Sequence, residues 1–368
     1  MNGLSEEEMA EFEVELNKNK APRPTVLVCG WTGAGKSSLI NTMLDVDAPI
    51  SDGTPCTRQF DVYENDLIRV YDSKGMEKGE TVTEFVKKLV GFIKERRTIY
   101  DIEKNIHIVW YTVDANSSRF DDGDVQIVKE LYELIGKRNI VFVLTKCDVA
   151  RKNQIDAVTE IIKERCEVND RDIIQVCDEE GINNKNTPKE VKEGVRELLT
   201  HSMYILPGAY HDAMILAQKV DIEMKLELIR NKKAKANAII TGATASAAAA
   251  AVVPIPVANT VAITGIQVAM VAGLAGLYTI GIPKEAIMPF IASVVGRQAA
   301  ASLLTLIPGL GSLINAGVAG SITGGIGMYC TSVFEKAANA KAKGEKLPDI
   351  TFDTKTVLDY IKNYKQLT

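Results

Sequence analysis

The segment TVLVCGWTGAGKSS, which covers residues 25–38, places the strongest constraint on how this chain can fold. Apolar and β-branched residues at 25–29 predict a buried strand, and the residues after Lys36 predict a helix over 36–45. Glycines let the intervening backbone wrap closely around a phosphate group, and the helix N-terminus offers unpaired N–H groups. The order strand, GxxxxGK[ST] loop, helix predicts a P-loop, with Lys36 reaching the outer phosphates and Ser37 coordinating Mg²⁺.

Strand and helix patterns alternate from residue 20 to residue 205. Strands are expected at 25–29, 58–64, 67–72, 105–113, 139–144 and 172–177, and helices at 36–45, 81–98, 123–137, 153–167 and 188–201. Buried apolar strands separated by amphipathic helices predict an α/β fold with a doubly wound, mostly parallel sheet. The expected parts are an N-terminal helix over 1–20, this sheet domain over 21–205, and an all-α domain over 206–368.

The predicted all-α domain is unusually apolar. One helix is expected over 209–235, ending in a basic cluster, and residues 236–283 carry no charge at all. Further helices are expected at 238–252, 257–281, 285–306, 312–335 and 353–366, so that 238–335 forms apolar hairpins. Small residues fit either a buried helical core or hairpins in contact with a membrane. Basic residues at 230–235 and 336–346 favour membrane association, with the hairpin ends in the cytosol.

Charge and cysteine usage exclude some classes of protein. Residues 1–235 hold 34 Lys and Arg against 42 Asp and Glu, whereas residues 236–368 hold 9 against 6. An acidic first part argues against nucleic acid as a partner, because phosphate backbones require a basic surface. The six cysteines show no CxxC or zinc-site spacing, which is typical of a reduced, cytosol-facing protein.

The segment TKCD at 145–148 predicts which base is bound. It follows the apolar strand that ends at Leu144. A carboxylate at Asp148 can accept the ring N–H and the exocyclic amine of guanine, a pair of donors that adenine does not present, while the stem of Lys146 packs on the base. The loop Val176-Cys177-Asp178-Glu179 is expected to contact the guanine oxygen through its backbone N–H groups.

A second phosphate motif lies between these segments. Asp72 ends an apolar strand and Gly75 follows at DxxG spacing, so Asp72 is expected to hold Mg²⁺ through water and the Gly75 N–H to contact the γ-phosphate. Asp114 also ends an apolar strand but lacks the glycine, which predicts a structural role. The Mg²⁺-binding switch threonine is expected to be Thr54 or Thr57, and Thr57 is preferred because it adjoins the strand.

The motifs GxTGxGKSSxINT, PxTR, DxxG and TKxD, in this order over residues 24–200, resemble those of an Era-like, translation-factor-class P-loop GTPase. The flank TGAGKSSLINTML and the TK variant are most similar to immunity-related GTPases and their bacterial relatives. The resemblance implies hydrolysis of GTP to GDP and phosphate, with Ser37, Thr57 and Asp72 serving Mg²⁺ and with Lys36, Thr57 and Gly75 acting in catalysis. The expected nucleotide-binding residues are Gly30, Thr32, Gly33, Ala34, Gly35, Lys36, Ser37, Ser38, Thr57, Gly75, Thr145, Lys146, Asp148, Cys177 and Asp178.

One position departs from the pattern. Met76 follows Gly75 where Ras-like GTPases carry a glutamine that orients the attacking water. A thioether can neither donate nor accept in that role, so hydrolysis is expected to be slow unless a partner, a dimer mate or a local residue supplies the missing group. Thr32, Arg58, Glu77 and Lys78 are local alternatives.

Residues 240–335 resemble an uncharacterised hydrophobic domain found after bacterial Era-like GTPases and in a bacterial inner-membrane protein. The resemblance implies a cytoplasmic protein that associates with the inner membrane. The chain is therefore expected to be a nucleotide-dependent switch or a membrane-remodelling GTPase, with GTP or GDP, membrane lipid and a second copy at the nucleotide face as partners. The alternative is a soluble GTP-gated protein-binding module with a permanently buried helical core.

Overall fold

The computed structural model describes residues 6–46, 60–75, 79–97, 104–252, 256–278, 316–348 and 354–367. The chain forms two compact units. Residues 22–221 form the sheet unit, and residues 1–21 together with 222–368 form the helical unit. The sequence placed this boundary at 205/206 and treated the first helix as a separate part. In the structure that helix belongs to the helical unit, so the sheet unit lies between two segments of it along the chain.

The sheet unit contains a six-stranded sheet in the order β2-β3-β1-β4-β5-β6. Among the described strands β2–β3 is the one antiparallel pair, which confirms the mostly parallel α/β sheet expected from the sequence. The strands are β1 (Thr25–Gly30), β2 (Phe60–Glu64), β3 (Arg69–Ser73), β4 (Ile108–Asp114), β5 (Ile140–Thr145) and β6 (Ile173–Gln175).

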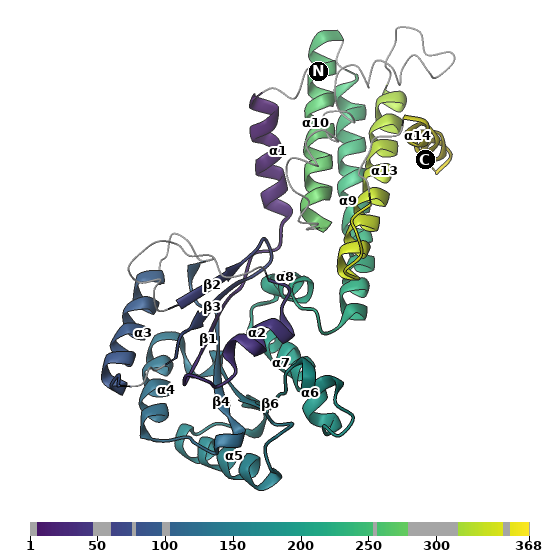
Figure 1. The fold of residues 1–368 in the computed structure, drawn as a ribbon. Helices are drawn as coiled ribbons and strands as arrows, with labels where there is room; N and C mark the ends of the chain where they lie inside the picture. The colour runs from purple at the N-terminus through teal and green to yellow at the C-terminus, as the bar shows by residue number, and fades with distance from the viewer. Residues whose placement is uncertain are drawn as a thin grey trace. The chain divides into compact units, whose positions relative to one another are not determined.

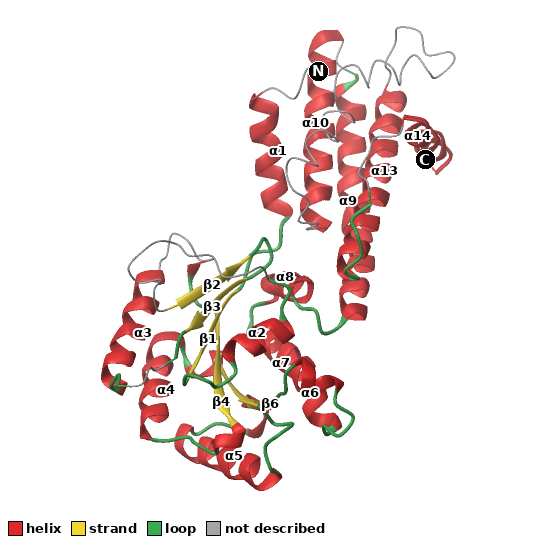
Figure 2. Cartoon of the chain, in the orientation of Figure 1, coloured by secondary structure: helices red, strands yellow, loops and turns green. Residues whose placement is uncertain are grey.

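Helices cover both faces of the sheet, as Figures 1 and 2 show. The apolar residues of α3, α4 and α5 pack with Leu27, Tyr111 and Phe142 in one continuous core. On the other face, Trp110 Nε1 donates to Ser202 Oγ of α7 at 3.0 Å. The helices of this unit are α2 (Lys36–Met43), α3 (Val82–Arg96), α4 (Asp122–Ile135), α5 (Lys152–Cys166), α6 (Glu179–Asn183), α7 (Lys189–Ile205) and α8 (His211–Ala217).

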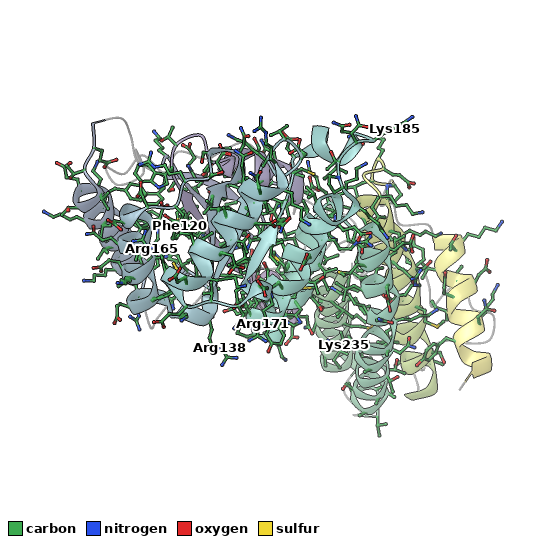
Figure 3. All side chains as sticks on the ribbon, turned by 90° about the horizontal axis from the view of Figure 1, so that it is seen from below. Phe120, Arg138, Arg165, Arg171, Lys185 and Lys235 are labelled. Carbon is green, nitrogen blue, oxygen red and sulfur yellow. The ribbon has the colours of Figure 1, made fainter. Side chains whose placement is uncertain are left out.

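Short 3₁₀ turns lead into the last two parallel strands and mark the amino-terminal edge of the sheet. They are η4 (Lys137–Asn139) before β5 and η5 (Asp170–Asp172) before β6. Their arginines, Arg138 and Arg171, are exposed at one rim of the unit (Figure 3). Ligands of open α/β sheets bind outside the opposite, carboxyl ends of the strands. The ligand site is therefore expected at the carboxyl ends of β1, β3, β4 and β5.

The helical unit consists of α1 (Glu6–Asn19), α9 (Ile222–Ala250), α10 (Pro256–Tyr278), α13 (Ala316–Ala342) and α14 (Thr354–Leu367). Small residues let these helices approach closely: a Cβ on Gly327 would lie 2.8 Å from Ile240 of α9 and 2.9 Å from the Met270 sulfur of α10. Within this packing Gln267 donates to Thr323 Oγ1 at 3.1 Å. Among the described helices, none combines the length and apolar character that crossing a membrane requires.

The prediction of a single helix over 209–235 is wrong. The structure has α8, a break, and then α9, which runs without interruption through the predicted boundary near residue 236. The break follows from the Gln218 side chain, whose Oε1 accepts from the backbone N–H groups of Val220 and Asp221. A side chain that satisfies these groups competes with helical hydrogen bonding. The helix expected over 285–306 lies outside the described residues.

An ion cluster fixes the turn between β2 and β3. Glu64 binds Arg69 through two hydrogen bonds of 2.7 and 3.0 Å, and it also pairs with Arg23 near the start of the sheet unit. Burial opposes ionisation of this carboxyl, but the hydrogen bonds and charges of Arg69 and Arg23 outweigh it and hold the pKa of Glu64 below its ordinary value. The cluster therefore depends on the ionised form of Glu64.

We expect Glu64→Gln to lower the free energy of unfolding by about 1 kcal/mol at neutral pH, a modest value because the pair is partly exposed. In the folded protein the pKa of Glu64 is depressed. Its contribution to stability is therefore fully present above the ordinary glutamate pKa of about 4.3, and it is lost as pH falls through the folded-state pKa. Urea unfolding at several pH values measures this. Glu160→Gln, which breaks an exposed pair with Lys163 on α5, is the control and should change stability little. A destabilisation by Glu64→Gln that persists in acid would contradict the assignment.

Candidate nucleotide-binding site

The predicted P-loop joins the end of β1 to the start of α2. Gly35 occupies the position before the helix with φ of 76°, a left-handed conformation that glycine adopts without strain. The turn is closed by a hydrogen bond from Ala34 N to the Trp31 carbonyl at 3.1 Å. The backbone therefore curls around the N-terminus of α2, where unpaired N–H groups favour an anion.

Lys36 lies inside this curl. Its side chain is buried, and its Nζ donates to the carbonyl oxygens of Trp31 at 2.9 Å and Gly30 at 3.3 Å. Burial lowers the pKa of Lys36, although the nearby Asp72 charge opposes this. The ammonium group is thus held at the centre of the loop, and its contact with the outer phosphates stays a prediction.

Ser37 and Asp72 meet beside the loop. Ser37 Oγ donates to Asp72 Oδ2 at 2.6 Å, and Asp72 is only 3% exposed. Burial raises the pKa of Asp72, opposed by the Ser37 hydrogen bond and the Lys36 charge. Its other oxygen, Oδ1, is buried and accepts no hydrogen bond from the described residues. A hydroxyl and a buried carboxylate with spare acceptor capacity fit a hard cation such as Mg²⁺.

Ser37 and Asp72 are the candidate cation ligands in the described part of the chain. Among the described residues there is no group of three or more His, Cys, Asp or Glu side chains placed to hold a metal. Mg²⁺ is commonly bound by one or two protein oxygens together with water and substrate phosphates. The Ser37 hydroxyl and the Asp72 carboxylate would supply two such oxygens.

Gly75 brings the DxxG segment onto the P-loop. A Cβ at this position would lie 2.6 Å from Thr32 N, 2.8 Å from Lys36 Nζ and 2.9 Å from the Gly30 carbonyl oxygen. Only a residue without a side chain permits this approach, and its φ of 75° also favours glycine. Thr32 Oγ1 further donates to the Lys74 carbonyl at 3.2 Å. The DxxG segment and the P-loop therefore lie in direct contact, and their binding of phosphate stays a prediction.

The TKCD segment is fastened to the same loop. Thr145 Oγ1 donates to the Ala34 carbonyl at 2.9 Å, and Lys146 Nζ donates to the Gly33 carbonyl at 2.8 Å. Lys146 also pairs with Asp114 Oδ2 at 2.7 Å. Asp114 Oδ1 accepts from Asn116 N, which agrees with the structural role predicted for it. The stacking of Lys146 on a base stays a prediction.

A pocket of about 370 Å³ lies next to the P-loop. Asp148 lines it, together with the expected loop residues Cys177 and Asp178. The backbone of Gly181 lies directly against Asp148, since a Cβ there would be 3.0 Å from the carboxyl group. Sequence reasoning missed four lining residues, which carry no motif of their own and are recognisable only from the fold: Leu39, Val149, Gly181 and Asn184. The predicted phosphate and base segments therefore adjoin one cavity.

Several predicted residues lie outside the described part of the chain. They are the switch candidates Thr54 and Thr57, Met76, and the local alternatives Arg58, Glu77 and Lys78. The roles of Thr57 in binding Mg²⁺ and of Met76 in turnover accordingly stay predictions.

Solved structures similar to this chain include a probable GTP-binding protein EngB, with 19% identity over 47% of this chain and 99% of that chain, at a TM-score of 0.33. Toc33 from Arabidopsis thaliana in complex with GDP and Mg²⁺ shows 18% identity over 58% of this chain and 95% of that chain, also at 0.33. At these scores the likeness says nothing of activity.

Two curated relatives match at higher identity. Immune-associated nucleotide-binding protein 9 from Arabidopsis thaliana is 26% identical over 206 residues, which are 52% of this chain and 58% of that protein. GTP-binding protein A from Dictyostelium discoideum is 30% identical over 129 residues, 33% of this chain and 27% of that protein. The matched region thus spans about half of the first relative and about a quarter of the second.

The model of the AIG1 family matches residues 24–224, which is more than half of the chain and nearly all of the sheet unit. The Era-like class, the likeness to immunity-related GTPases and the hydrophobic-domain resemblance of residues 240–335 stay predictions. The chain belongs to the AIG1 family.

Proposed function

We propose that the sheet unit binds GTP and hydrolyses it to GDP and phosphate, as a nucleotide-dependent switch. The observation that carries this proposal is the convergence of Lys36, Asp72 and Gly75 on one loop that adjoins the pocket lined by Asp148. Names of the two relatives, a nucleotide-binding and a GTP-binding protein, support it.

In the proposed reaction, Lys36 keeps its contact with the Trp31 carbonyl and also donates to the outer phosphates, since an ammonium group has three donors. The N–H groups at the start of α2 bind the inner phosphates, and the Gly75 N–H contacts the γ-phosphate. Ser37, Asp72 and Thr57 are the residues that would hold Mg²⁺, which neutralises charge on the β- and γ-phosphates when bound. Asp148 orients the nucleotide by accepting two hydrogen bonds from guanine.

Calorimetric titration of the purified chain with GDP and ADP, each with Mg²⁺, tests this proposal. We expect GDP to bind and ADP to bind at least about 100-fold more weakly, because adenine leaves the Asp148 carboxylate without donors. Equal affinities would refute guanine selection, and no binding of either nucleotide would refute the function.

We further propose that hydrolysis is slow in the isolated chain, since Met76 cannot orient water, and that a second copy docking at the nucleotide face accelerates it. Single-turnover hydrolysis across a protein-concentration series should give a rate that rises with concentration. A fast rate that does not depend on concentration would exclude this part of the proposal.

The end of α2 is the proposed point from which nucleotide state is passed to the helical unit. Hydrogen bonds link this helix end to the segments where the chain enters and leaves the sheet unit. Met43 O accepts from Lys219 N at 2.9 Å, and Asp45 N donates to Ala217 O at 2.8 Å, close to the exit of the chain. Asp45 O also accepts from Asn65 of the β2–β3 turn, which binds Arg23 near the entry. Movement of α2 would thus reach both connecting segments.

For the helical unit we propose a protein-binding module gated by GTP. The described part of α10 is largely buried among α1, α9 and α13, as a permanent core would be. Association with the cytoplasmic face of a membrane is the second candidate, favoured by residues 286–334, where Arg297 is the only charge. Flotation with anionic phospholipid vesicles, in GDP and in a nonhydrolysable GTP analogue, separates them, because the module should not float in either state.

A further inference from the structure

Trp31 links the P-loop to the core of the sheet unit. Its indole Nε1 donates to Asp124 Oδ1 at 2.7 Å, and the Arg119 guanidinium lies 4.2 Å above its ring. Its carbonyl oxygen, in turn, is the closest contact of Lys36 Nζ, at 2.9 Å. One residue therefore holds the lysine through its backbone and is itself held through its side chain.

Asp124, near the N-terminus of α4, is built as an anchor. It is completely buried and accepts from three donors: Trp31 Nε1, the Tyr111 hydroxyl at 2.7 Å and Asp121 N at 2.9 Å. Burial raises the pKa of Asp124, and these hydrogen bonds oppose the rise. A buried carboxylate surrounded by donors on three sides has little freedom to move.

The segment before α4 reinforces the anchor. Phe120, labelled in Figure 3, is buried and packs edge-on against Phe142 with ring centroids 6.2 Å apart. The neighbouring Arg119 pairs with Asp121 at 2.8 Å. The indole of Trp31 thus contacts α4 at its N–H group and the segment before α4 over its face.

The capping of α4 and its attachment to the sheet account for two of the three hydrogen bonds to Asp124. The bond from Asp121 N belongs to the capping box of α4, and the bond from Tyr111 ties α4 to β4. The Trp31 bond instead reaches a loop 93 positions earlier in the sequence. This hydrogen bond therefore connects α4 to the P-loop, a connection that the stability of α4 does not require.

We propose that Asp124 is a positioning residue, which through the Trp31 indole sets the Trp31 carbonyl, the place of Lys36 and the shape in which the P-loop meets phosphate. The inference rests on the proposed nucleotide binding, since it concerns the same site. Two substitutions separate positioning from stability. Trp31→Phe keeps an aromatic ring and removes the indole donor, whereas Tyr111→Phe removes the other donor to the same oxygen and leaves the P-loop contact intact.

The test is calorimetric titration of the full chain and both variants with GDP and Mg²⁺, together with thermal unfolding and amide hydrogen exchange of the nucleotide-free proteins. We expect Trp31→Phe to weaken GDP binding about tenfold, the loss of one charge-assisted hydrogen bond, and to speed exchange in residues 31–36 but not in β5. Tyr111→Phe should stay within about twofold of the unsubstituted chain in affinity, with unchanged exchange in the loop.

Unchanged affinity and exchange in Trp31→Phe would overturn the inference, and so would an equal loss in Tyr111→Phe, because the effect would then belong to the core rather than to the loop. If the unsubstituted chain bound no GDP, the proposed function would fail, while exchange of residues 31–36 in the nucleotide-free variants would still decide whether Asp124 positions the loop.

Discussion

Lys36→Ala is expected to abolish most GTP hydrolysis, by about 10²–10³-fold, and to weaken GDP binding by about 10–100-fold. The buried ammonium at the centre of the P-loop is the positive side chain best placed to meet charge developing on the outer phosphates, and alanine offers no donor in its place. Alanine is also a good residue at the start of a helix interior, so α2 should persist. Single-turnover hydrolysis and GDP titration measure both losses.

Lys74→Ala is the matched control for this prediction. Lys74 has an exposed side chain next to the same loop, and its carbonyl oxygen accepts from Thr32 Oγ1. Its removal deletes one positive charge near the site without touching the lysine at the centre, so both activity and binding should remain near those of the unsubstituted chain. Hydrolysis by Lys36→Ala within about threefold of normal would contradict the proposed phosphate site.

The P-loop and the sheet could be predicted from the sequence because their signals are local. A strand pattern, two glycines and a lysine at fixed spacing specify how about a dozen consecutive residues fold, whatever surrounds them. The alternation of apolar strands with amphipathic helices likewise specifies a mostly parallel sheet, because such strands are buried on both faces. Each prediction depended on neighbours along the chain.

Contacts between distant segments could not be predicted in the same way. The bonds from Lys146 to Gly33 and to Asp114 depend on β4 and β5 lying next to one another in the sheet. The hydrogen bond from Trp31 to Asp124 is of the same kind. Neither residue belongs to a periodic sequence pattern. Buried aspartates are also uncommon, so the sequence gives no reason to expect one here. Only the fold places them together.

The helical unit shows a different limit. Alanine-rich sequence offers almost no amphipathic contrast, so the uninterrupted course of α9 through residue 236 was missed, and a charged segment was taken for a helix end. The packing of α1 against α10 was missed as well, because it joins the first helix to a segment more than 200 residues later. There Gly276 lies against the Leu16 carbonyl, a contact visible only after folding.

Asp148→Asn is expected to change which nucleotide the pocket prefers. The carboxylate offers two acceptors, which suit the ring N–H and the amine of guanine, whereas an amide offers one acceptor and one donor. Xanthine carries an oxygen where guanine carries the amine, so it matches the amide. GDP affinity should fall about 100-fold or more, and xanthosine diphosphate should become the tighter ligand, because a pocket built for hydrogen bonds penalises unmatched groups. Titration of the variant with both nucleotides measures the change.

Asp178→Asn provides the control in the same pocket. It removes the same charge, but Asp178 uses Oδ1 to accept from Gly181 N at 3.0 Å, a bond that an amide oxygen can also accept. The preference for GDP should therefore survive this change. Equal loss of preference in both variants would mean that pocket charge, rather than the two acceptors of Asp148, selects the base. Retention of full GDP affinity in Asp148→Asn would place the base elsewhere, since no matched pair of donors and acceptors would then have been lost.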